Sequence, residues 1–153
     1  MSPEARLLVS PVIVKPRKSS TPESEYEAKT GDDILRAAQS AAYALDEIEL
    51  VKYLKGCLGR PLVAFVTKTA GANTVSRWAS GRVRPDREVW ERMRTLALVH
   101  LAVKHIVGGS ATTAAQWLVG ANPTLDGVMP AAELREHHDR AVFSAVRMLA
   151  QTL

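Results

Sequence analysis

The segment between Asn73 and Asp86 combines amide, hydroxyl and guanidinium side chains at a spacing that suits recognition of a polyanion. In a helix that follows Asn73, the side chains of Val75, Trp78 and Ala79 share one face, so the polar side chains occupy the opposite face. Guanidinium groups bind phosphate oxygens or the edge of a guanine base. We therefore predict a DNA-binding surface formed by Asn73, Thr74, Ser76, Arg77, Arg82 and Arg84.

Boundary residues place this surface on the second helix of a helix-turn-helix. Asn73 predicts an N-cap, because its side-chain oxygen can accept a backbone N–H of the first turn. Gly81 predicts the helix end, because glycine enters the left-handed region without a Cβ clash. A preceding helix from Pro61 to about Thr69 and a turn at residues 70–72 complete the motif, whose second helix enters the major groove of DNA.

Structural roles stay open for some of these residues. Arg77 could form an ion pair with Glu88 or Glu91 instead of contacting DNA. For the indole rings of Trp78 and Trp117, simple packing in the core is the favoured role.

The distribution of charge agrees with a DNA-binding interpretation, although the total charge is modest. The formal net charge is +4 and the pI is about 9.5. Basic residues dominate residues 60–87, whereas acidic residues dominate residues 23–49. The positive charge therefore surrounds the predicted reading helix.

Hydrophobic periodicity predicts an all-α protein. The chain is 46% hydrophobic, only 5% of its residues are aromatic, and alternating strand patterns do not occur beyond the N-terminus. We expect a first helix from Asp32 or Asp33, then one from Asp46 to Gly59 that is separate or a bent continuation. Further helices are expected from Pro85 to about Val107, from Thr112 or Thr113 to Val119, and from Pro130 onward.

The long helix from Pro85 to about Val107 is apolar on nearly all sides in its second half. A helix with this pattern must be buried. It either joins two layers or enters a subunit interface, unless the flanking helices of the same chain cover it.

Composition divides the chain into three parts. Residues 1–30 combine repeated prolines with serine and glutamate, which predicts a mobile N-terminal arm. Residues 31–107 hold the helix-turn-helix, and residues 108–153 form a small C-terminal domain. Cys57 is the only cysteine, and no signal peptide or membrane-length apolar segment is visible, so we expect a cytoplasmic protein without membrane contact.

Catalytic and cofactor motifs are missing from the sequence. It contains no P-loop, no GxGxxG, no HExxH and no GxSxG pattern. His137 and His138 are neighbours, so on a helix they point about 100° apart and cannot hold one metal ion together. We therefore predict no enzymatic activity, no catalytic residue, no metal site and no cofactor.

Several stretches together resemble the Xre/MbcA/ParS antitoxin family. They are residues 62–67 (LVAFVT), 74–81 (TVSRWASG), 92–94 (RMR) and above all 117–130 (WLVGANPTLDGVMP), and the similarity covers about Glu47 to Leu153. The resemblance implies an N-terminal helix-turn-helix and a C-terminal toxin-binding domain. It places the toxin contacts at Trp117, Asn122, Pro123, Leu125, Met129 and Pro130.

The resemblance also implies the partners. The first is a RES-domain toxin that consumes NAD, encoded by an adjacent gene, whose substrate pocket the antitoxin covers. The complex would bind promoter and operator DNA of its own operon, and the family's homo-oligomers, dimers or higher, bury the middle helices. Two alternatives are a stand-alone helix-turn-helix transcription regulator and a toxin-neutralising adaptor that has lost DNA binding.

Overall fold

The structure is a computed structural model that describes residues 30–153, so the arm predicted for residues 1–30 lies outside the described residues except for Thr30. The described part of the chain is helical and contains no strand, which confirms the all-α class. Its elements are α1 (Gly31–Ala44), α2 (Glu47–Leu58), α3 (Arg60–Thr67), α4 (Ala72–Ala79), α5 (Arg87–Ile106), α6 (Ala111–Val119), the 3-10 turn η1 (Pro123–Leu125), α7 (Pro130–Arg135) and α8 (Asp139–Thr152).

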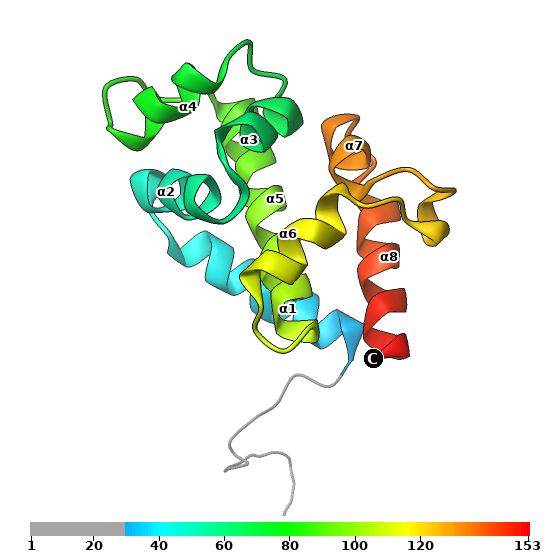
Figure 1. The fold of residues 1–153 in the computed structure, drawn as a ribbon. Coiled ribbons are helices and arrows are strands. Elements are labelled where there is room, and N and C mark those ends of the chain that lie inside the picture. The colour runs from blue at the N-terminus through cyan, green and yellow to red at the C-terminus, as the bar shows by residue number, and fades with distance from the viewer. Residues whose placement is uncertain (1–29) are drawn as a thin grey trace, which may run out of the picture.

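Helix α5 is the central element, and α1, α2, α3, α6 and α8 all pack against it. Figure 1 shows α3 and α4 toward one end of α5, and α1 and the C-terminal end of α8 toward the other. The side chains of Leu96, Ala97, Val99 and Val103 on α5 are fully buried. Flanking helices of the same chain therefore cover this apolar helix, which was one of the alternatives.

Several helices begin at other residues than predicted, because nearby oxygen-bearing side chains make better caps. Helix α1 begins after Thr30, whose hydroxyl accepts the N–H of Asp33 at 3.1 Å. Helix α5 begins after Asp86, so Pro85 precedes the helix instead of opening it. Helix α6 likewise begins after Ser110, one or two residues before the predicted start. In each case the cap oxygen satisfies a backbone N–H of the first turn.

The single helix predicted from Pro130 onward is in fact two helices, α7 and α8. His137 at the break has a positive φ of 64°. The Arg92 guanidinium donates to the carbonyl of Leu134 at 3.1 Å and to both carboxylate oxygens of Asp139. In a continuous helix that carbonyl would accept from residue 138, so the Arg92 contacts favour the break.

The hydrophobic core is continuous across the predicted domain boundary at residue 107. Buried residues from α1 to α8 belong to one cluster, in which Leu96 of α5 joins Leu118 of α6 and Val142 of α8. Arg135 of α7 also stacks 4.7 Å from the centre of the Phe65 ring of α3. Among the described residues, no helix has both the length and the apolar character needed to cross a membrane.

Candidate nucleic-acid interface

Helices α2, α3 and α4 pack against one another, and α2 and α3 also pack against α5. The turn at residues 68–71 lies between α3 and α4. Lys68 closes α3 in the left-handed conformation at φ 58°. Gly71 is extended and serves as the N-cap of α4 without a side-chain hydrogen bond. The N-cap role predicted for Asn73 is therefore wrong, because the chain enters the helix at Ala72.

The inner face of α4 is formed as predicted. Val75 is fully buried, and Trp78 and Ala79 are each 5% exposed. These side chains join the core cluster, so Trp78 packs in the core. Gly81 follows with a φ of 80°, as predicted for the residue that ends the helix.

The outer face of α4 presents Asn73, Arg77 and Ser80 as exposed side chains. Their spacing of four and then three residues aligns them in a row along the helix. Thr74 and Ser76 are only half exposed, and the Ser76 hydroxyl accepts a hydrogen bond from Arg60 at 3.0 Å. Asn73 and Arg77 of the predicted surface thus lie in one exposed row, whereas Thr74 and Ser76 lie at its edge.

Arg77 and Arg82 carry charge that no carboxylate neutralises within residues 30–153. Of the acids considered as partners for Arg77, Glu91 pairs with Arg87 at 3.3 Å and Glu88 lies 3.8 Å from His137. The backbone N–H of Arg82 donates to the carbonyl of Arg77 at 3.1 Å, which holds both residues at the C-terminal end of α4. Within the described residues, the alternative role of Arg77 as the ion-pair partner of Glu88 or Glu91 is not observed.

Arg84 differs from the other predicted cations because it already has a partner. Its Nε and Nη2 donate to the two carboxylate oxygens of Glu47 at 3.1 and 2.6 Å. These hydrogen bonds, followed by the attraction of the carboxylate charge, raise the pKa of Arg84 above its ordinary value. The Glu47 carboxylate therefore competes with any phosphate for this guanidinium.

Arg60 was missed as a member of this surface. It is exposed at the start of α3, and its contact with Ser76 places it beside α4. In a helix-turn-helix the first helix crosses the DNA backbone, so a basic residue directly before Pro61 was the available signal.

The residues predicted to hold the toxin are mostly interior. Asn122 is 8% exposed, and its side-chain oxygen accepts the N–H of Thr124 at 2.9 Å. Leu125 and Pro130 are buried, Trp117 and Met129 are half-buried, and only Pro123 is exposed. Asn122, Leu125 and Pro130 thus shape the loop before α7 from within.

Exposed apolar side chains occur in the same segment at positions that we did not predict. Val119 at the end of α6 is 49% exposed, and Val128 in the loop before α7 is 40% exposed. They are the side chains of this segment that a protein partner could cover.

Comparisons with protein-family models, curated proteins and solved structures find no match to this chain. The chemistry of the site therefore has to be read from its geometry. The unpaired guanidinium of Arg77 and the exposed amide of Asn73 on α4, together with Arg82 beyond the helix end, can bind a phosphodiester backbone and base edges.

Proposed function

We propose that the protein binds DNA through α4 and serves as an antitoxin against a RES-domain toxin. The DNA-binding part is supported by one observation above all, the unneutralised charge of Arg77 and Arg82 next to exposed Asn73. Helix α4 has its apolar face in the core, so the row of side chains is held in a fixed orientation.

The exposed side chains of this surface suit different roles on DNA. The guanidinium of Arg77 matches the two acceptors of guanine, and the amide of Asn73 matches the donor and acceptor of adenine. Arg82 beyond the helix end and Arg60 on α3 would contact phosphates, which position the helix without reading sequence.

The test of DNA binding is a salt titration with the DNA that lies directly upstream of the coding sequence. We expect the logarithm of the association constant to fall linearly with that of the salt concentration, by about 0.9 per neutralised phosphate. Arg77→Ala should lose about 1–3 kcal/mol and relax specificity, whereas Arg82→Ala should weaken all sequences alike. Arg140→Ala, an exposed arginine on α8, is the control. Equal binding by Arg77→Ala, Arg82→Ala and wild type would exclude α4 as the interface.

The antitoxin part is supported by the resemblance of residues 117–130 and by the exposure of Val119 and Val128 there. In this proposal the C-terminal half covers the NAD pocket of the toxin. Homo-oligomers, dimers or higher, would place two copies of α4 on adjacent half-sites of the operator.

The test of the antitoxin part is co-expression with the product of each adjacent gene, with the tag on the neighbour only. We expect the untagged chain to co-purify with a toxic neighbour and to restore growth. The double variant Val119→Ser and Val128→Ser should lose both effects, whereas Val83→Ser, which is 43% exposed beside α4, should keep them. If neither neighbour is toxic or binds the chain, a stand-alone regulator remains. Rescue without DNA binding would instead identify an adaptor.

A further inference from the structure

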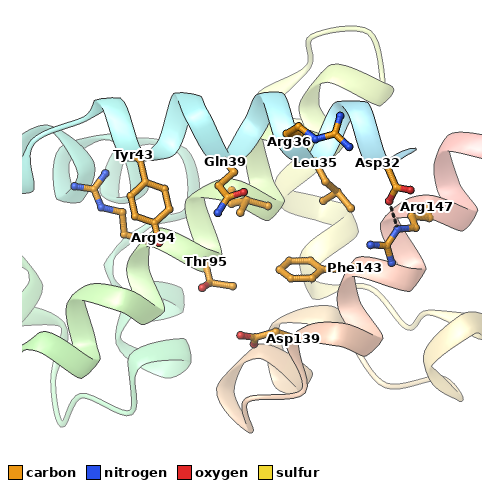
Figure 2. A pocket seen from close by; sticks show the side chains of 11 residues that line it. Asp32, Leu35, Arg36, Gln39, Tyr43, Arg94, Thr95, Asp139, Phe143 and Arg147 are labelled. Carbon is orange, nitrogen blue, oxygen red and sulfur yellow. Dashed lines mark hydrogen bonds and ion pairs between the residues drawn. The ribbon is translucent and has the colours of Figure 1, made fainter. Parts of the chain in front are cut away.

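A cavity of about 400 Å³ lies between α1, α5 and α8 (Figure 2). Its volume falls within the range of small-molecule sites, and sites between the helices of a bundle are common. Side chains from all three helices point toward it in Figure 2, including Gln39, Thr95 and Phe143. It lies apart from the outer face of α4, whose residues are not among those lining it.

One of the arginines around this cavity has no acidic partner among the described residues. Among the arginines in and beside it, Arg36 has Asp33 at 3.0 Å and Arg147 has Asp32 at 2.7 Å. Arg92, just behind the wall, has Asp139 at 2.6 Å. Arg94 lines the cavity, and in the described part of the chain it has no carboxylate partner.

Arg94 is also the most deeply buried of these cations, at 7% exposure. Its Nη1 donates to the carbonyl of Ala42, but its buried Nε has no hydrogen-bond partner among the described residues. The guanidinium lies 4.5 Å from the centre of the Trp90 ring and 5.1 Å from that of Tyr43. A buried cation usually has an anionic partner, and the two aromatic faces offset the missing anion only in part.

Tyr43 lies at the approach to Arg94. Figure 2 shows the Tyr43 ring between the guanidinium and the rest of the cavity. This side chain is 60% exposed, so a turn of its ring toward solvent would open the path. Beyond Tyr43, Leu98 and Phe143 provide an apolar wall, and Thr95 adds a hydroxyl.

We propose that this cavity binds a small organic monocarboxylate, with its carboxylate at Arg94 and its apolar body against Leu98 and Phe143. A carboxylate matches the fork of a guanidinium. A single negative charge is favoured, because Arg94 is the only arginine lining this cavity without an acidic partner among the described residues, and Asp32 and Asp139 in the wall would repel a second charge.

The test is calorimetric titration of the full chain with 4-phenylbutyrate and with its neutral amide, 4-phenylbutyramide. We expect the acid to bind, and the amide to bind about ten- to a hundredfold more weakly, since it lacks the charged hydrogen bonds. Absence of binding by the acid, or equal affinity for acid and amide, would overturn the proposal. Stronger binding of acetyl-glutamyl amide than of phenylbutyrate would assign the cavity to an acidic side chain of a protein partner and would also overturn it.

Variants locate the site. Arg94→Met keeps the length of the side chain without its charge and should abolish the preference for the acid, whereas Arg140→Met outside the cavity should keep it. If Arg94→Met does not fold, Gln39→Trp provides the test, because exposed Gln39 lines the cavity and a larger ring there should block binding. Undiminished acid binding by Gln39→Trp would place the ligand elsewhere. Upstream DNA binding should be equal in all folded variants, so this test is independent of the proposed function.

Discussion

The hydroxyl of Tyr53 on α2 lies 2.6 Å from Nδ1 of His100 on α5, while Nε2 of His100 lies 3.1 Å from the carbonyl of Ala111. A carbonyl can only accept, so Nε2 carries the proton and Nδ1 accepts from the tyrosine. Burial is the main cause that raises the pKa of Tyr53 above its ordinary range, so the hydroxyl keeps its proton. The neutral, fully buried imidazole thus joins α2, α5 and the start of α6.

This arrangement predicts a loss of stability in weak acid. Burial lowers the pKa of His100 below its ordinary value of 6.5, and the charge of Lys104 adds to this, although the bond to Ala111 opposes it. As the pH falls below 6.5, the histidine of the unfolded chain therefore binds a proton, whereas His100 in the folded chain stays neutral to lower pH. The free energy of unfolding should fall, with a slope of at most about 1.4 kcal/mol per pH unit for this one proton.

Urea unfolding over a pH series measures the effect. In His100→Gln the part of the slope that belongs to this residue should vanish, whereas His105→Gln, which changes an exposed histidine, should leave it in place. An unchanged slope in His100→Gln would assign the acid sensitivity to other groups.

Local sequence signals were enough to predict the all-α class and the inner face of α4. The spacing of Val75, Trp78 and Ala79 determines which side chains share a face, whatever the rest of the fold does. The start of α2 is also set by local residues. The side chains of Asp46 and Glu49 each accept the backbone N–H of the other there, so the sequence alone nearly determines where this helix begins.

Long-range contacts explain what the sequence could not predict. The break before α8 depends on Arg92, which is distant in the chain from Leu134 and Asp139. The partner of Arg84 is Glu47 on another helix. The cavity beside Arg94 is formed by residues of three helices, so no local pattern predicts it. The one signal was an arginine within an apolar stripe of α5, because a buried arginine usually has a polar partner.

The ion pair between Arg92 and Asp139 should be important for stability. The two side chains are only 12% and 27% exposed and share two hydrogen bonds. Asp139→Ala should lower the free energy of unfolding by about 1.5–3 kcal/mol, because it leaves a half-buried guanidinium without its acid. Glu91→Ala removes the acid of an exposed pair with Arg87 and should cost no more than about 1 kcal/mol. Equal losses in urea unfolding would contradict the argument.

The end of α4 should depend on Gly81. Its φ of 80° is unfavourable for any residue with a Cβ, and a Cβ there would lie 3.2 Å from Cδ1 of Ile48. We expect Gly81→Ala to lower the free energy of unfolding by about 1–2 kcal/mol. Gly56→Ala within α2 has open space around it and should instead raise stability by about 0.5–1 kcal/mol. Thermal unfolding that shifts in the same direction for both variants would contradict this explanation.

Glu47 should restrain DNA binding through Arg84. Glu47→Gln removes the carboxylate that holds this exposed guanidinium, so Arg84 becomes free to reach a phosphate. We expect tighter binding to the upstream DNA and a salt dependence steeper by about one ion. Glu91→Gln changes the net charge equally but frees Arg87, which is not part of the interface, and should have a smaller effect.

Arg84→Gln tests whether Arg84 stays paired with Glu47 or moves to a phosphate when DNA binds. If Glu47 keeps its partner when DNA binds, Arg84→Gln should change the affinity little in comparison with Arg77→Gln, because the lost charge was already neutralised. A loss equal to that of Arg77→Gln would mean that Arg84 leaves Glu47 for a phosphate on binding. Anisotropy titrations of Arg84→Gln and Arg77→Gln with the same upstream DNA decide between them.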